Sequence, residues 1–339
     1  MKRIEAISAA TTLGVALGVL PVMAHPMAAA LAPLPLALCF LLLLQGRRIF
    51  LLPTLFFAGF FLGAASSMLP SAEAGALASL AERLRERIDT IPFHCNSTAA
   101  LLKAFLTGYR AELNPEVKAV FRLSGASHLL ALSGLHIGIL YTILSKATII
   151  IGNSPAGRIV RSTIAVGAAL VFTLMTGASP SIVRAFLFIL GSETAKLTHR
   201  SRDPLKILSL ALMVQLVISP REILSLGFQL SYLAVLGIFI LFPRMKEWFP
   251  GKSWDPLKKL WDTSVLTISC QLFTAPLVWM HFHSFPKHFL ITNLLAIPLT
   301  TLTLSLGILA VIIPSGLPPK AAEWCADLLI SCLEIISTM

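Results

Sequence analysis

The sequence predicts an all-α fold: a polytopic transmembrane helical bundle of about eleven spans, with amphipathic helices on its outer face. Of the 339 residues, 56% are hydrophobic and only 13% are charged, whereas a soluble domain usually carries about 25% charged residues. A soluble fold of this length could not bury so much apolar surface, so lipid must cover much of it. Apolar runs of about 18 residues or longer also recur along the chain, as transmembrane helices require.

Residues 1–70 are predicted to form the N-terminal transmembrane helices. An apolar run from 6 to 23 follows a basic pair and resembles a signal peptide. A second apolar run, from 27 to 44, follows at once and favours an uncleaved first helix. A third span is expected from 49 to 69.

Residues 71–126 are predicted to be an amphipathic helical segment on the outer face. Seven basic and six acidic side chains lie between 71 and 122, a balance that suits the face where no positive excess is needed. Apolar residues recur at three- and four-residue steps from 77 to 88, which predicts an amphipathic helix. A second helix, 98–106, is expected to lie along the membrane surface.

Residues 127–339 are predicted to form the main transmembrane domain. Its expected spans are 129–151, 162–176, 181–197, 205–219, 223–242, 263–281, 289–313 and 321–338. With the N-terminus in the cytoplasm, the segments rich in Lys and Arg lie inside. The turns near 177, 220 and 285, which carry few basic residues, then lie outside.

The formal net charge of +11 does not by itself indicate nucleic-acid binding, because cytoplasmic loops of membrane proteins are enriched in Lys and Arg. The five cysteines include no CxxC pair, so neither a zinc site nor a disulfide framework is expected. The sequence contains no GxxxxGK[ST], HExxH or GxSxG motif. We therefore expect no ATP motor, catalytic residue, metal or cofactor.

Polar residues inside apolar spans are costly and are candidates for function. The first such patch contains His128, Ser133, Gly134 and His136. If this stretch is one helix, both histidines lean to the same face, while Ser133 and Gly134 permit a break or a close backbone approach. The alternative is that these groups only hydrogen-bond and pack against neighbouring helices.

The second patch contains Arg184, which follows a turn and opens an apolar helix. Its guanidinium either reaches the outer interface or faces an aqueous cavity and grips a phosphate. The third patch contains Gln229 and Ser231, which are alternatively ordinary interhelical hydrogen-bonding residues. The histidines of 281–288 are expected to form an interfacial turn rather than a metal site.

These patches carry a resemblance to a known family. Residues 124–138, SGASHLLALSGLHIG, are similar to the characteristic motif of the ComEC competence-protein family. Three further stretches match in the same order, within 176–185, 227–237 and 274–294. The resemblance covers about residues 98–310.

The resemblance implies a channel in the bacterial inner membrane that passes single-stranded DNA to the cytoplasm during natural transformation. Such a path must be hydrated and lined by polar or cationic groups. The residues expected to line it are His128, Ser133, His136, Ser181, Arg184, Gln229 and Ser231. Those expected to capture DNA on the outer face are Arg83, Arg85, Arg87, Lys103 and Arg110. Helix breaks or close packing are expected at Gly134, Gly138, Gly177, Gly227 and Pro276.

The expected partners are single-stranded DNA and membrane lipid. A separate nuclease, a DNA receptor and a cytoplasmic helicase or motor are further candidate partners. The oligomeric state stays open. Long members of the family also carry an OB-like domain and a metallo-β-lactamase-like domain, and this sequence contains neither pattern. A small-molecule or lipid transporter is the alternative function, and an intramembrane enzyme built on the two histidines is a third.

Overall fold

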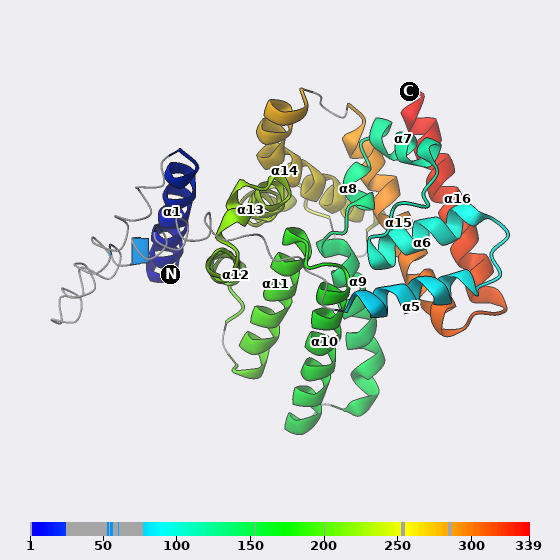
Figure 1. The fold of residues 1–339 in the computed structure, drawn as a ribbon, viewed down its shortest axis with the longest axis horizontal. Helices are drawn as coiled ribbons and strands as arrows, with labels where there is room; N and C mark the ends of the chain where they lie inside the picture. Colours follow the sequence, from blue (N-terminus) through cyan, green and yellow to red (C-terminus); the bar gives the residue numbers. More distant parts are fainter. Residues whose placement is uncertain are drawn as a thin grey trace. The chain divides into compact units, whose positions relative to one another are not determined.

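A computed structural model describes residues 2–24, 53, 55–56, 60, 77–152, 154–199, 201–251, 255–283 and 287–339 (Figure 1). Within these ranges the fold is helical and contains no strand. The all-α prediction is therefore confirmed for this part of the chain.

The first half of the chain contains α1 (Lys2–Ala24), α5 (Ala78–Asp89), α6 (Asn96–Thr107), α7 (Pro115–Leu123), α8 (Ser127–Leu130), α9 (Gly134–Ala147), η2 (Thr148–Ile151) and α10 (Pro155–Met175). The second half contains α11 (Pro180–Leu197), α12 (Pro204–Ile218), η3 (Pro220–Leu224), α13 (Leu226–Lys246), α14 (Pro256–Phe282), α15 (Phe289–Ile312) and α16 (Leu317–Ser337). Several of these helices begin with Pro in the first turn, where its missing N–H costs no hydrogen bond.

The chain divides into two compact units. The first comprises residues 1–73 and 187–232, and in it α1 packs against α12 and η3. The Ser8 hydroxyl donates a hydrogen bond to the Ser209 carbonyl at 3.0 Å, which ties the first helix to α12.

The second unit comprises residues 74–186 and 233–339 and is organised around the helix pair α15 and α16. Helices α6 and α7 pack against α16, and α6 also contacts α15 (Figure 1). Gly307 lets α15 approach α6, since a Cβ built there would meet the Leu102 side chain at 2.3 Å. Near the other end of α15, the Thr292 hydroxyl donates to the Ser124 carbonyl at 2.7 Å.

Helix α6 is therefore part of the core. Every residue from Ala100 to Thr107 is buried, because the helix is apolar on nearly all sides. The expected helix 98–106 does form, but it is buried instead of exposing a polar face. Its place along the membrane surface stays a prediction. Helix α5, in contrast, buries only Ala81 and Ile88 and keeps a polar outer face.

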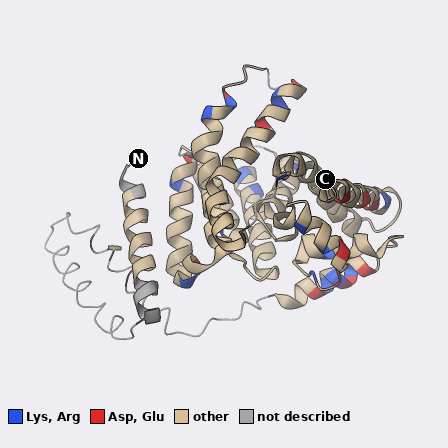
Figure 2. Cartoon of the chain, turned by 90° about the horizontal axis from the view of Figure 1, so that it is seen from above, with Lys and Arg blue, Asp and Glu red and all other residues tan. Residues whose placement is uncertain are grey.

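Five of the described helices are long and apolar enough to cross a membrane: Gly134–Ile151, α10, α13, α14 and α15. They match five of the predicted spans, so the chain is a multi-pass membrane protein. Figure 2 shows long stretches of helix without charged residues, with blue and red gathered towards helix ends, on short helices and along the helix that ends at C.

The other predicted spans that fall on described residues do not meet the same criteria. Helix α12 is apolar but only 15 residues long, and the apolar part of α1 is Ala6–Leu17. Helix α16 carries Lys320 and three acidic residues, one of them the buried Glu323. The spans predicted at 27–44 and 49–69 lie outside the described residues, apart from isolated positions. The count of about eleven spans stays a prediction, as do the domain boundaries at 70 and 126.

Candidate functional site

The chain breaks between α8 and α9, where the sequence has Ser133 and Gly134. Helix α8 ends at Leu130 and α9 begins at Gly134, with Ser133 as its N-cap. The Ser133 hydroxyl accepts a hydrogen bond from Leu135 N–H (3.3 Å), and Ser133 N–H donates to Nδ1 of His136 (3.2 Å). This is a capping box in which an imidazole takes the place of the usual Glu or Gln. The capping box satisfies backbone N–H groups that would otherwise lack a hydrogen-bond acceptor at the start of α9.

The two histidines of this stretch lie in different surroundings as a result. His128 is exposed on α8, and its Nδ1 donates to the Gly125 carbonyl at 3.2 Å. His136 is only 1% exposed and packs edge-on against Phe105, with ring centroids 5.5 Å apart. The spacing predicted a shared face for one continuous helix, and the break removes that condition. A path-lining role for His136 stays a prediction from the sequence.

Arg184 lies beside the α8–α9 break. It is half-buried in the second turn of α11. A Cβ atom built on Gly134 would lie 3.4 Å from Nη2 of Arg184 and 3.3 Å from Cβ of Ala185. The missing side chain of Gly134 therefore allows the start of α11 to approach closely. The fold thus brings together the first two polar patches, which are about 50 residues apart in the sequence.

A tight turn between α10 and α11 sets the position of Arg184. Gly177 has φ 79°, and its successor Ala178 donates its N–H to the Thr173 carbonyl at 2.9 Å. This bond, together with one from Gly177 N–H to the helix end, forms a Schellman motif, which needs the left-handed conformation that glycine adopts without strain. The chain then enters α11 at once, with Ser181 half-buried in its first turn.

Gln229 and Ser231 belong to the first compact unit, whereas the other five predicted path residues belong to the second. Nε2 of Gln229 donates to the Ile223 carbonyl at 2.8 Å, which ties the start of α13 to η3. Ser231 is half-buried two residues further along α13. The third patch therefore belongs to a different unit from the first two.

Only some of the residues predicted to allow helix breaks or close helix packing lie in close contact with another element. At Gly138 and Gly227, no described atom lies within 4 Å of a built Cβ. Pro276 lies inside α14 and is exposed. Among the described members of this set, Gly177 has a positive φ that favours glycine, and Gly134 lies in a tight contact with α11.

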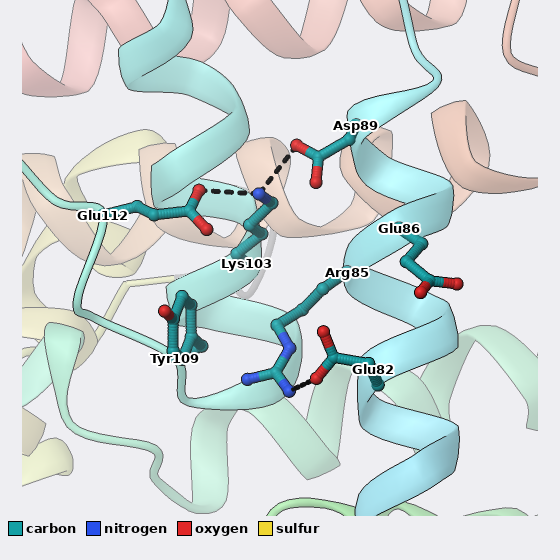
Figure 3. A pocket seen from close by; sticks show the side chains of 7 residues that line it. All are labelled: Glu82, Arg85, Glu86, Asp89, Lys103, Tyr109 and Glu112. Atoms are coloured by element: carbon teal, nitrogen blue, oxygen red, sulfur yellow. Dashed lines mark hydrogen bonds and ion pairs between the residues drawn. The ribbon is translucent and has the colours of Figure 1, made fainter.

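The basic residues predicted to capture DNA divide into two groups. Lys103 and Arg85 line a pocket of about 170 Å³ between α5, α6 and the loop after α6 (Figure 3). The Lys103 side chain is 4% exposed, and its Nζ lies 2.7 Å from Oδ1 of Asp89 and 2.6 Å from Oε2 of Glu112. Burial lowers the pKa of Lys103, but the two carboxylates outweigh it and leave this pKa above its usual value.

Arg85 is engaged in the same way. It forms an ion pair with Glu82, and its guanidinium lies over the Tyr109 ring, 4.5 Å from the centroid (Figure 3). Four carboxylates and two cations line this pocket, so it suits a phosphate poorly. The remaining predicted capture residues, Arg83, Arg87 and Arg110, are exposed.

The buried carboxylate of Glu323 was not predicted from the sequence. Its Oε1 accepts a hydrogen bond from Cys95 N–H at 2.6 Å, at the N-cap of α6. An anion at a helix N-terminus is favoured by the unpaired N–H groups and the helix dipole. The two residues are 228 positions apart, so no local pattern could have indicated this contact.

Comparison with known families identifies the chain. The model of the Competence protein family matches residues 105–339, which include all four stretches that carry the resemblance. The chain belongs to this family. The membership predicted from the four ordered patches is therefore confirmed.

Three relatives of this Competence family member are informative. It is 27% identical over 251 residues to ComE operon protein 3 of Bacillus subtilis (strain 168), which covers 71% of this chain and 30% of the relative. It is 28% identical over 203 residues to the uncharacterized protein YcaI of Escherichia coli (strain K12), which covers 57% of the chain and 26% of the relative. An uncharacterized protein of Aquifex aeolicus (strain VF5) is 26% identical over 239 residues, 69% of the chain and 53% of the relative.

The chain thus spans less than a third of the first two relatives and about half of the third. No solved structure matches it.

Proposed function

We propose that this protein forms the membrane route by which single-stranded DNA enters the cell during natural transformation. The observation that carries the proposal is the Competence family match over residues 105–339, with the polar patches inside it. The chain is then a multi-pass protein of the bacterial inner membrane, with its N-terminus in the cytoplasm and about eleven spans. It acts as a channel rather than as an enzyme.

Arg184 is the residue most suited to meet the strand inside the membrane. A polyanion crossing a low-dielectric slab needs cationic or polar groups along its path. A guanidinium offers a planar fork of donors that matches a phosphate and keeps its charge at any physiological pH. The Schellman turn and Gly134 support the proposal, because they fix the start of α11 on which Arg184 lies. Ser133 and Ser181 supply hydroxyl groups to the same region, and His128 an exposed imidazole.

Capture on the outer face would rest on Arg83, Arg87 and Arg110. These side chains are exposed and are not joined by an ion pair to any described carboxylate. Contacts to the phosphate backbone would give binding that is independent of sequence and weakened by salt. A DNA receptor, a nuclease and a cytoplasmic motor would be separate partners.

Transformation of a deletion strain complemented with variants tests the role of Arg184. Arg184→Ala should lower the transformation frequency by about a hundredfold, equivalent to about 2.7 kcal/mol, because charge-assisted phosphate contacts are lost. Arg184→Lys should fall between, since an ammonium is a point charge without the fork. The matched control is Arg202→Ala, which removes an exposed arginine before α12. Wild-type transformation by Arg184→Ala, with equal protein in the membrane, would exclude the role.

Transport of a small molecule or lipid is the second candidate function. The observation in its favour is an apolar cavity of about 460 Å³ beside His136. Import of labelled DNA separates the two: a deletion strain that still imports DNA normally favours the transporter. Loss of import without change in lipid composition favours the DNA route.

A further inference from the structure

Helix α14 carries a continuous polar face within its membrane-spanning part. Six polar or weakly polar residues make up this face: Thr263, Ser264, Thr267, Cys270, Gln271 and Thr274. They lie one, four, seven, eight and eleven residues after the first, which places them on one side of an α-helix. At about 1.5 Å per residue the face extends about 17 Å, more than half of a hydrocarbon core of about 30 Å.

The other side of α14 carries apolar side chains and packs against α13. A Cβ built on Gly237 of α13 would lie 2.8 Å from the Phe273 ring. Leu266 and Leu272, which lie away from the polar face, are 37% and 57% exposed. Lipid can cover these two leucines without cost, whereas polar groups in lipid lose hydrogen bonds that nothing replaces. The polar face therefore needs different surroundings.

Arg184 lies beside the middle of the polar face. Its positive charge is close enough to act on the Cys270 thiol, and both residues belong to the second unit. Gly134, at the break between α8 and α9, borders the same guanidinium. The polar face of α14 thus joins the region in which the first two polar patches meet.

The hydroxyl groups of the face use their protons within the helix. Thr263 and Ser264 each donate to the carbonyl four residues earlier at 2.9 Å, and Thr274 does so at 3.1 Å. Each hydroxyl oxygen can still accept a hydrogen bond. Gln271 adds an amide that both donates and accepts. Thr263, Ser264, Cys270 and Gln271 are half-buried, whereas Thr267 and Thr274 are buried.

An uncharged face of this kind suits nucleobases better than phosphates. A hydroxyl oxygen whose proton is already donated gains no hydrogen bond from a phosphate oxygen, because both are acceptors. Base edges carry N–H donors as well as acceptors. Arg184 supplies the positive charge that a phosphate needs. A single strand can present its phosphates to one wall and its bases to another.

We propose that the polar face of α14 is the uncharged wall of the DNA route beside Arg184, and that Gln271 contacts the bases of the passing strand while Arg184 holds its phosphates. The inference rests on the proposed function and adds a second wall to it. Weak, uncharged contacts let the strand move on, as conduction requires.

Modification of cysteines tests whether the face is hydrated. Gln271→Cys and Leu272→Cys are made in a protein whose five native cysteines are replaced by serine, and the full chain is placed in phospholipid nanodiscs. The anionic reagent sulfonatoethyl methanethiosulfonate should modify Gln271→Cys at least about tenfold faster, because thiols react as thiolates and lipid suppresses their ionisation. Leu272→Cys is the matched control, since Leu272 adjoins Gln271 and is the more exposed of the two.

Protection by DNA tests the occupant. A single-stranded oligothymidylate at ten times its Kd should slow the modification of Gln271→Cys about tenfold. Inorganic phosphate at the same concentration should not slow it, because a lone phosphate brings no base to the face. In the unsubstituted protein, peptide mapping should show the same protection of native Cys270. The buried Cys325 is the control there and should stay unmodified.

Equal modification of Gln271→Cys and Leu272→Cys would overturn the proposal, because the face would not be hydrated. Fast modification of Gln271→Cys that the oligonucleotide does not slow would overturn its contact with the strand. Equal protection by phosphate would assign the face to a small anion instead. The first measurement contains no DNA, and import by the deletion strain is measured separately. A failure of the α14 wall is therefore distinguishable from a failure of the proposed function.

Discussion

The basic side chains of α5 fall into two groups that differ in what lies opposite them. Arg85 faces Glu82 and the Tyr109 ring, close to the Lys103 ion pairs, and takes part in the fold. Arg83 and Arg87, its neighbours in sequence, are exposed. A count of basic residues treats all of them as DNA-capture residues. We therefore expect a cation of this region to be available to a phosphate only where carboxylates of the same protein have not already bound it.

Removing Lys103 should give the largest effect on stability. Lys103→Met keeps the buried stem but loses two charge-assisted bonds, and should cost about 2 kcal/mol of unfolding free energy. Because the pKa of Lys103 is raised, the ion pairs stabilise the fold below the ordinary lysine pKa for as long as both carboxylates remain ionised. On the alkaline side, this contribution is lost as the pH rises through the raised value. Unfolding in detergent micelles, followed by tryptophan fluorescence at neutral and alkaline pH, measures both effects.

The same variant should bind DNA as the wild type does. If Lys103→Met weakened the binding of a single-stranded oligonucleotide without loss of stability, the division of the basic residues would be wrong.

Reversing the exposed group should act on binding instead of stability. Replacing Arg83, Arg87 and Arg110 by Glu should weaken oligonucleotide binding about tenfold at low salt, or about 1.4 kcal/mol. The salt dependence should also flatten, because fewer phosphates are neutralised. Fluorescence anisotropy between 50 and 200 mM salt follows the change. Unaltered binding at low salt would remove these residues from the capture surface.

Two glycine variants of α9 apply the same comparison to Arg184. Their expected effect on transformation is the smallest of the three predictions. Gly134→Ala places a Cβ 3.4 Å from Nη2 of Arg184 and should lower transformation about two- to fivefold by displacing the guanidinium. Gly138→Ala, one turn later, meets no described atom and should instead stabilise α9 by about 0.5–1 kcal/mol. Equal effects of the two variants on transformation would show that the close approach at Gly134 has no role.

The sequence predicted the long helices well. Helices α9, α10, α13, α14 and α15 each coincide with a predicted span to within about seven residues at the ends, because long apolar runs between turn residues have few alternatives. The helix break at Ser133 and the turn at Gly177 were also visible, since both depend on local residues. These features determine the position of Arg184.

The surroundings of α6 could not be predicted in this way. The sequence predicted that this helix lies along the membrane surface and that Lys103 captures DNA. Its partners Asp89 and Glu112 come from outside the helix, and together they allow the ammonium to be buried. The different surroundings of His128 and His136 could not be predicted either. A spacing of eight residues predicts a common face only when the helix between them is unbroken.

The contact between Cys95 and Glu323 also has a consequence for biosynthesis. The carboxylate that closes the start of α6 is translated 228 residues after the amide that it accepts. At ribosomal rates of about 5–20 residues per second, that interval lasts roughly ten to fifty seconds. During this time α6 lacks the helices that will cover its leucines, and lipid or the insertion machinery has to shelter them. Assembly of this membrane domain is therefore completed late, when α15 and α16 emerge.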